Sequence, residues 1–436
     1  MASQNLSQEA SWLQLQAGLQ KIALSAPASA FGEPSDVNAL KLQQEIQSGL
    51  LFAMLLAETE AHVIKYLDLV AIFQRDKYAW FCSLLRHMIA DRFPKIQKRP
   101  LVFIFKVIIP QLLLREAAQP AFPELIQASW RWLSLGSGAN PHLVDCVVDT
   151  LKNHTRWLYQ NPMLISVVFY SLCGALLDME RSSVPHIAAL REEAAMQCVR
   201  LWKERQADVR QLGRDLIRAV SNVPRLDPIQ REFHSILAEQ LKQRTSRLYT
   251  QIRLTKDMES QIVFIFQSVR VNFHARHFEW FKERHLSSES SDMLIPELVR
   301  FVVNTFHPDN KLLRSDFVPR WLFLGWLLRQ CRGPVSASAS KLALLYDWLY
   351  YVDPTDRFMN VEAPLLLMWH SLERNPDLTA ELLEFMISHY DQSPIKDRVG
   401  HSIQKGLSLC LANKVIPYSS CCLIAWSFSQ SLYYFW

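Results

Sequence analysis

Three histidines, His274, His277 and His285, lie within one short stretch and are the side chains best spaced for metal chemistry. His274 and His277 are three positions apart, so on a helix they would share one face. A zinc site needs further ligands of suitable geometry, and no cysteine lies nearby in the sequence. We therefore interpret these histidines as part of a solvated polar helix face, and we predict no bound metal or cofactor.

The sequence contains no motif for catalysis. It has no P-loop, no G-x-G-x-x-G, no H-E-x-x-H and no G-x-S-x-G. The nearest glycine cluster, Gly136-Ser137-Gly138, precedes Asn140-Pro141 and is typical of a turn between two helices. We predict that the protein is not an enzyme.

A basic segment, Lys242–His285, carries nine Lys or Arg side chains against four acidic ones, and aromatic residues interleave with them. Arginine beside aromatic rings suits single-stranded nucleic acid, which is bound through charge and stacking. The same mixture suits a protein interface, and it also fits a solvated helix face over an aromatic core. The residues expected to contact a partner or a nucleic acid are Arg244, Arg247, Arg253, Arg270, Arg276 and Trp280.

A second charged cluster precedes this segment. Its basic members alternate with Glu204, Asp208 and Asp215 at spacings of three and four residues. Such alternation usually gives ion pairs on the surface of a helix, so we assign the cluster no function. The basic members are Arg200, Lys203, Arg205, Arg210, Arg214 and Arg218.

The apolar residues recur with the period of an α-helix. One stripe joins Ile262, Ile265 and Phe266, and another runs from Leu212 to Val223. Glycine is scarce, at 11 residues in 436, which disfavours glycine-rich β and nucleotide-binding folds. We predict an all-α fold, a HEAT- or armadillo-like superhelix of helical repeats. Helix starts are predicted at Asn161-Pro162, Asp227-Pro228, Asp353-Pro354, Asn375-Pro376 and Ser393-Pro394.

The predicted organisation has three parts. Residues 1–35 form a flexible segment with a short helix, residues 36–400 one continuous repeat domain, and residues 401–436 a truncated last helix with an atypical apolar tail. The N-terminus lacks the features of a signal peptide, and the internal apolar runs are predicted to be too short to span a bilayer. The 8 cysteines form no C-x-x-C pair and indicate small buried side chains in a reducing compartment.

From about residue 210 onward a series of short motifs occurs in a characteristic order, and weaker similarity extends back to about Leu42. With these motifs the sequence resembles the N-terminal half of the Integrator complex subunit 3 family, whose members also belong to the SOSS complex. The motifs are GRDLIR (213–218), QRTSR (243–247), RLTKDME (253–259), HPDN (307–310), PRW (319–321), GWLL (325–328), KLALLYDWL (341–349) and MNVE (359–362).

The resemblance implies a HEAT-type scaffold in the nucleus, with the cytoplasm as a second expected location. One implied assembly is Integrator, which processes small nuclear RNA 3′ ends and attenuates transcription. The other is the SOSS complex, a sensor of single-stranded DNA in damage signalling and repair. In this sensor the N-terminal half holds an OB-fold single-stranded DNA-binding protein together with a small third subunit. Nucleic acid contact is then mainly indirect, and no membrane partner is expected.

Two alternatives remain open: direct nucleic-acid binding through residues 242–285, and a helical transport or coat adaptor. The sequence also departs from the family pattern. The family's C-terminal half is absent, and the similarity fades near Pro417-Tyr418. The 22 uncharged residues 415–436 are expected to reflect a truncated or mis-spliced gene model rather than a membrane anchor.

Overall fold

The structure, a computed structural model, describes most of the chain between residues 37 and 415, and all regular elements in that part are helical. One isolated antiparallel bridge, between Arg270 and Phe317, is the extended pairing there. This confirms the predicted all-α fold, whereas the HEAT or armadillo assignment stays a prediction. The described ranges are 37–72, 78–92, 98–115, 121–130, 141–180, 184–221, 223–251, 254–287 and 289–415.

Several predicted features lie outside these ranges. They are the segment 1–35, the cluster Gly136-Ser137-Gly138, Arg253 and the tail 416–436. The described part divides into two compact units, which we treat separately. Of the described residues, the first unit contains those between 37 and 130 and those from 141 to 164, and the second contains those from 165 to 415. One continuous repeat domain over residues 36–400 stays a prediction.

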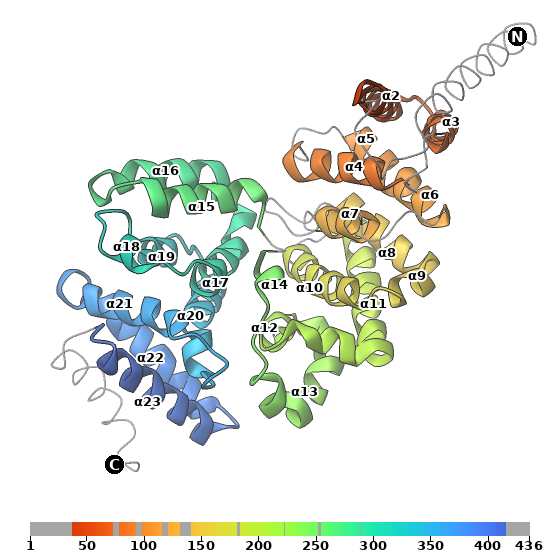
Figure 1. Cartoon of the computed structure of the whole chain (residues 1–436). Coiled ribbons are helices and arrows are strands. Elements are labelled where there is room, and N and C mark those ends of the chain that lie inside the picture. Colours follow the sequence, from red (N-terminus) through yellow and green to blue (C-terminus); the bar gives the residue numbers. More distant parts are fainter. Residues whose placement is uncertain are drawn as a thin grey trace, which may run out of the picture. The chain divides into compact units, whose positions relative to one another are not determined.

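In the first unit α3 packs against α2 and α7 packs against α4 (Figure 1). Thr59 starts α3, because its side-chain oxygen accepts a hydrogen bond from the His62 N–H at 3.3 Å. The helices are α2 (Val37–Leu56), α3 (Glu60–Ala71), α4 (Ala79–Arg92), α5 (Lys98–Phe103), the π-helical turn η3 (Ile104–Ile108), α6 (Ile109–Leu114), α7 (Ala121–Trp130), α8 (Pro141–Asn153) and α9 (Thr155–Tyr159).

The π-helical turn η3 has a local cause in Pro110. Proline has no N–H to bond the carbonyl of Lys106, and its ring would collide with that carbonyl in a regular α-helix. The Ile109 N–H bonds instead to the carbonyl of Ile104, five residues back. The helix therefore continues through the proline at the cost of one wider turn.

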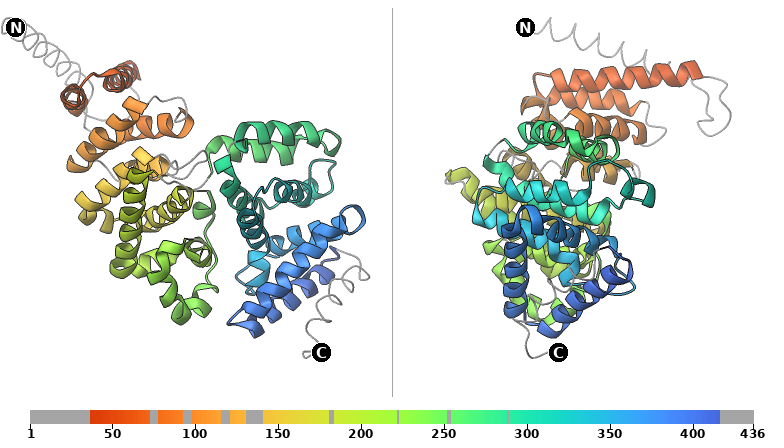
Figure 2. Two further views of the ribbon diagram at one scale, coloured as in Figure 1. Left: turned by 180° about the vertical axis from the view of Figure 1, so that it is seen from behind. Right: turned by 90° about the vertical axis from the view of Figure 1, so that its left-hand side faces the viewer.

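The second unit begins within α10 and ends with α23. In the two views of Figure 2, the green helices α15 and α16 run side by side. Its helices are α10 (Pro162–Met179), α11 (Pro185–Val209), α12 (Asp215–Ser221), α13 (Asp227–Gln240), α14 (Arg247–Gln251), α15 (Lys256–Ser268), α16 (His274–His285), α17 (Ile295–Thr305), α18 (Asn310–Leu313), α19 (Arg320–Arg329), α20 (Pro334–Leu349), α21 (Met359–Arg374), α22 (Pro376–Gln392) and α23 (Lys396–Ala412), with short 3-10 turns between some of them.

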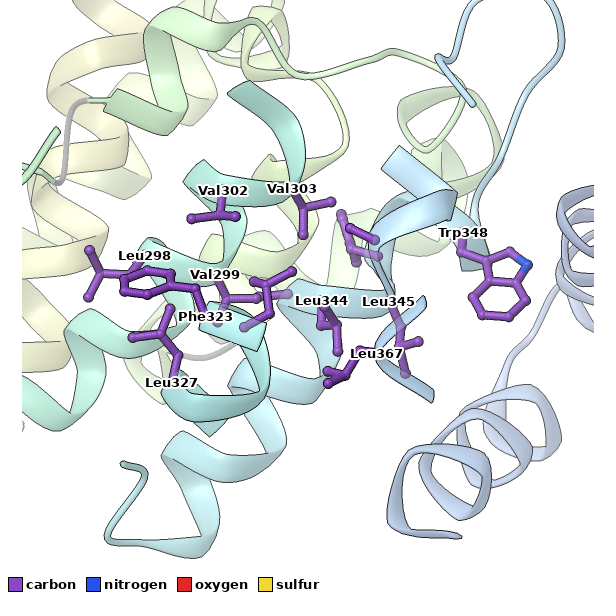
Figure 3. Packing of buried hydrophobic residues seen from close by; sticks show 14 of the residues in the cluster. Leu298, Val299, Val302, Val303, Phe323, Leu327, Leu344, Leu345, Trp348 and Leu367 are labelled. Carbon is purple, nitrogen blue, oxygen red and sulfur yellow. The ribbon is translucent and has the colours of Figure 1, made fainter. Parts of the chain in front are cut away.

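Helix α17 is the centre of the second unit, because every residue from Ile295 to Asn304 is buried. Its apolar side chains pack against α19, α20 and α21. Figure 3 shows Val299, Phe323 and Leu344 from three of these helices meeting in one cluster. Each fully buried side chain of this size stabilises the fold by about 1.5–3 kcal/mol. The polar residues of α17 are therefore carried into the interior by their apolar neighbours.

Helix α10 corrects one sequence prediction. Its 18 residues, 162–179, have a mean hydropathy of 1.7 and are long and apolar enough to cross a membrane by length and composition. The prediction that the internal apolar runs are too short was wrong for this helix. However, 78% of the stretch is buried inside the structure, as in the core helix of a compact domain.

The structure confirms some of the predicted helix starts and contradicts one of them. Helices α10 and α22 begin at Pro162 and Pro376, as expected, and Pro228 lies in the first turn of α13. Asp353-Pro354 was wrong as a helix start: the peptide bond is cis, the residues form a turn, and α21 begins only at Met359. The Asp-Pro pair lies in a turn there. The same local sequence signal is compatible with a turn as well as with a helix start.

Candidate interaction surfaces

The α15–α16 hairpin carries three of the predicted contact residues. Thr255 caps α15 by accepting a hydrogen bond from the Met258 N–H at 3.1 Å. On the inner side, Phe278 and Phe281 of α16 pack edge-on against Phe323, with ring centroids 5.2 and 5.7 Å apart. This packing fixes which side of the hairpin faces outward.

The outer side of the hairpin exposes aromatic rings. Phe264 is 46% exposed, Phe273 64% and Trp280 40%. We call these three residues the aromatic face. Large exposed aromatic side chains concentrated on one hairpin are typical of protein contact sites.

The basic residues around the aromatic face are mostly neutralised. Arg270 pairs with Asp316 at 3.4 Å, and Arg284 pairs with Asp257 at 2.9 Å. Arg276 is exposed and makes no ion pair in the described part of the chain. The net charge available to a phosphate backbone on this surface is therefore small, although the sequence shows an excess of basic residues.

The three histidines of this region are used in packing and hydrogen bonding. His274 and His277 lie edge-on to Phe278 and Phe264, and His285 bonds Gln261 at 2.9 Å. Among the described residues, no group of three or more His, Cys, Asp or Glu side chains is arranged to hold a metal ion.

Beneath the second unit's surface lies a network of buried charges. Its three arginines and four carboxylates are no more than 6% exposed and come from α12, α17, α20 and the turns that precede α12 and α21. We call them the ion-pair core. The members are Arg214, Asp215, Arg218, Glu297, Arg300, Asp347 and Asp356.

Arg300 is the centre of the ion-pair core. Its guanidinium forms bidentate hydrogen bonds to Asp215 at 2.9–3.0 Å and to Asp347 at 2.8 Å. Burial alone would raise the pKa values of both carboxyls, but the charge of Arg300, with Arg218 at Asp215 and Arg214 at Asp347, holds them below their usual range. Both carboxylates therefore stay ionised in the interior.

The other two arginines extend the network. Arg214 bonds Asp356 at 2.8 Å, and Arg218 bonds Glu297 at 2.8 Å. The predicted surface location of Arg214 and Arg218 was wrong, since they are 0% and 3% exposed. A charge pattern at helical spacing does not reveal which side of a helix is covered by the rest of the fold. The exposed pair Arg200–Glu204 does match the prediction.

A second group of arginines lies at the edge of this core. Arg244 precedes α14, Arg247 begins it, and Arg357 precedes α21. We call these three residues the arginine triad. Arg247 and Arg357 are exposed and Arg244 is half-buried, and none of them forms an ion pair with a described carboxylate. The predicted contact residues thus separate into two places, the hairpin and the triad.

His307 links two members of the triad, Arg247 and Arg357. Its Nδ1 lies 3.4 Å from a guanidinium nitrogen of Arg247 and 3.4 Å from one of Arg357. Its Nε2 lies 2.8 Å from Oδ1 of Asn360, which must accept the hydrogen bond. Nδ1 therefore carries the lone pair and accepts from the arginines. Burial, helped by the charges of Arg320 and Arg247, lowers the pKa of His307 to about 4, so the ring is neutral at physiological pH.

The low pKa values of His285 and His307 predict that the protein loses stability on acidification. His285 and His307 have folded-state pKa values of about 4, below the ordinary 6.5, chiefly because of burial. Between these values the unfolded chain binds protons that the folded chain does not, so stability falls as pH drops from 6.5 toward 4. The midpoint of urea unfolding should be lower at pH 4.5 than at pH 7, and less so in a His285→Gln/His307→Gln variant. Equal midpoints at the two pH values would contradict this assignment.

The first unit also has a concave feature, a cleft of about 200 Å³ beside the π-helical turn. It is lined by Phe105, Lys106, Asp149 and His154 among others. Its cation is already compensated, because Lys106 pairs with Asp145 at 2.9 Å. The cleft therefore lacks the uncompensated positive charge of the triad.

The ion-pair core and the triad draw on segments that are far apart in sequence. Arg214 and Asp215 come from GRDLIR, Thr245 from QRTSR, and Asp347 from KLALLYDWL. The Thr245 hydroxyl accepts from the Asp215 N–H at 3.0 Å, and the Asn360 amide of MNVE donates to Asp347 at 2.5 Å. Four of the eight motifs that carry the family resemblance, GRDLIR, QRTSR, KLALLYDWL and MNVE, therefore meet at one polar centre.

The profile of the Integrator complex subunit 3 N-terminal family matches residues 41–425. The chain belongs to this family. The match begins where the sequence similarity was expected to begin, near Leu42, and it continues past Tyr418. Both the helical fold and the polar centre of the second unit lie within the Integrator subunit 3 match.

Curated relatives agree with this family. The chain is 30% identical over 400 residues to the Integrator complex subunit 3 homolog of Drosophila erecta, covering 86% of this chain and 36% of the relative. It is 29% identical to Integrator complex subunit 3 of Homo sapiens, covering 87% of this chain and 37% of the relative. Integrator complex subunit 3 of Danio rerio is also 29% identical, with 84% and 37% covered. The chain thus spans little more than a third of these relatives.

Proposed function

We propose that this chain is a non-catalytic scaffold subunit of nuclear complexes. It acts within Integrator, in small nuclear RNA 3′-end processing and transcription attenuation, by binding other Integrator subunits. It also holds an OB-fold single-stranded DNA-binding protein, together with a small third subunit, in DNA damage signalling and repair. The observation that carries the proposal is the family match over residues 41–425.

The aromatic face supports a role in protein contact. Its rings are exposed, while the neighbouring cations Arg270 and Arg284 are paired with acids. Exposed aromatic anchors with compensated charges favour a protein partner, because a nucleic-acid backbone would need uncompensated cations along a track. We include Arg270, Arg276 and Trp280 in the proposed contact surface.

The scaffold function is tested by reconstitution with purified proteins. The full chain, mixed with an OB-fold single-stranded DNA-binding protein and the small third subunit, should elute with them from a size-exclusion column. Trp280→Ala should weaken the binding of the OB-fold protein or of the small third subunit by about 30-fold, as expected for an exposed aromatic anchor that becomes buried in an interface. Met196→Ala serves as the control, because Met196 is an exposed apolar residue on a different helix, α11. Separate elution of a folded chain would contradict the scaffold function.

Direct nucleic-acid binding through residues 242–285 is the alternative function. It predicts that the chain alone binds single-stranded DNA with an affinity that falls steeply with salt. Charge reversal at Arg244, Arg247 and Arg253 should then reduce both the affinity and its salt dependence. We expect this affinity to be weak, since the charges on the hairpin are mostly compensated. A salt-sensitive affinity comparable to that for the OB-fold protein would favour the alternative.

A further inference from the structure

The arginine triad is a cluster of three cations in the second unit that have no described acidic partner. The four buried arginines around it each bind a carboxylate, whereas no triad member does so in the described part of the chain. Those four are Arg214, Arg218, Arg300 and Arg320. Three cations gathered without acidic partners repel one another, so a bound anion would relieve the repulsion.

The triad's charges act on one another at short range. His307 brings guanidinium nitrogens of Arg247 and Arg357 to within 3.4 Å of a single atom. The pKa of Arg244 is lowered first by burial, and the charges of Arg357 and Arg247 lower it further. Arg244 also has a buried Nε without a hydrogen-bond partner, and its one described side-chain hydrogen bond, to Asn304, is long at 3.4 Å.

The nearest carboxylates do not compensate the triad. Asp347 and Asp356 raise the pKa of Arg244 and so lie within electrostatic reach. Asp347, however, is held by both guanidinium nitrogens of Arg300 at 2.8 Å, and Asp356 is held by Arg214 at 2.8 Å. The negative charges of Asp347 and Asp356 are therefore already compensated inside the ion-pair core. The outward-facing N–H groups of the triad's guanidinium groups remain available to bind an anion.

We propose that the arginine triad binds the phosphate group of a phosphorylated serine or threonine on a partner protein. A carboxylate brings one negative charge and two oxygens, whereas a phosphate monoester brings a charge of about −1.5 to −2 and three acceptor oxygens at neutral pH. Three planar guanidinium groups match that number of acceptors and can bind them as forks. His307 acts as a positioning residue, because its neutral ring holds two of the arginines together without adding charge.

A protein-borne phosphate fits better than a nucleic acid or a free ion. The triad is one compact site, and the described hairpin cations Arg270 and Arg284 are paired with acids, which disfavours a continuous track of free cations along the hairpin. Arg247 and Arg357 are exposed, so a small ion alone would gain few contacts against its loss of freedom. Peptide residues beside the phosphate can supply the missing contacts. The inference rests on the proposed scaffold function.

The test compares three probes with the full chain. Beads carry a degenerate phosphoserine peptide pool, its unphosphorylated counterpart or oligo-dT, and inorganic phosphate is the soluble competitor. Retention on the phosphorylated pool should exceed retention on the unphosphorylated pool by about tenfold or more. An Arg247→Glu/Arg357→Glu variant should lose that difference. Arg329→Glu, a reversal at an exposed arginine of α19 that has no described acidic partner and lies outside the proposed contact surface, should keep it within about twofold.

Four outcomes would overturn the proposal: equal retention on both peptide pools, an equal loss with Arg329→Glu, stronger triad-dependent retention on oligo-dT, or competition by inorganic phosphate at micromolar concentration. Circular dichroism melting shows whether the double variant is folded, and Arg357→Lys, which keeps the charge but not the fork, should bind with intermediate strength. The same double variant should still elute with the OB-fold protein. A failed phosphate test with intact co-elution would refute the triad site and leave the scaffold function standing.

Discussion

Replacing Arg300 with methionine should destabilise the second unit by about 3–5 kcal/mol. The side chain is fully buried and bonds both Asp215 and Asp347 through its guanidinium nitrogens. Removing it leaves two buried carboxylates without their main counter-charge, and the cost of an uncompensated buried charge is far larger than the net gain of forming the pair. The midpoint of urea unfolding measures the loss.

The matched control is Arg200→Met on α11. Arg200 also pairs with a carboxylate, Glu204, at 3.0 Å, but the two side chains are 41% and 44% exposed. Exposed helix pairs contribute at most about 0.5 kcal/mol. Hydrogen exchange should accelerate in α12, α17 and α20 for Arg300→Met and remain unchanged in those helices for the control. Equal destabilisation by the two substitutions would show that the ion-pair core does not hold these helices together.

Replacing Gly213 with alanine should cost about 2–5 kcal/mol. Gly213 has φ +72°, where a side chain is strained, and an added Cβ would lie 2.7 Å from the carbonyl oxygen of Arg244. The two backbone segments are tied by the hydrogen bond from the Arg214 N–H to the Gln243 carbonyl at 2.8 Å. Alanine must therefore push Arg244 away from α12, and we expect weaker retention on the phosphorylated peptide pool as well as lower stability.

Gly49 provides the opposite control. It lies inside α2, and a Cβ added there would meet nothing within 4 Å. Gly49→Ala should therefore stabilise the chain by about 0.5–1 kcal/mol, through reduced entropy of the unfolded state and better helix propensity. If Gly213→Ala and Gly49→Ala shifted the melting temperature in the same direction, the role given to the backbone at Gly213 would be contradicted.

The sequence alone was informative where a property depends on local spacing. The stripe of Ile262, Ile265 and Phe266 is buried on one side of α15, as its period predicted. The stripe from Leu212 to Val223 was wrong as one helix, since Gly213 turns the chain between two elements. A glycine within an apolar stripe is compatible with one continuous helix or with a turn between two elements. Only the packing of the segment at Arg244 against Gly213 decided for the turn.

The candidate sites were only half visible in the sequence. Arg244 and Arg247 stood out through local charge, whereas Arg357 and His307 belong to other segments and do not lie in a run of basic residues. One signal for the ion-pair core was available in α17: Glu297 and Arg300 lie three residues apart in an otherwise apolar helix. Charges in such a helix indicate buried groups that need partners from other segments, here Arg218 for Glu297 and Asp215 and Asp347 for Arg300.

The sequence by itself determined the helices, the family and the excess of basic residues, because each follows from residue types at short spacing or from ordered motifs. Tertiary structure alone decided which basic residues are compensated. Arg214 and Arg218 are bound by carboxylates, including Asp356 and Glu297, about 80 to 140 residues away in sequence, and the triad is not bound by any described acid. Charge compensation depends on distances of a few ångströms, and the fold sets these distances by bringing distant segments together.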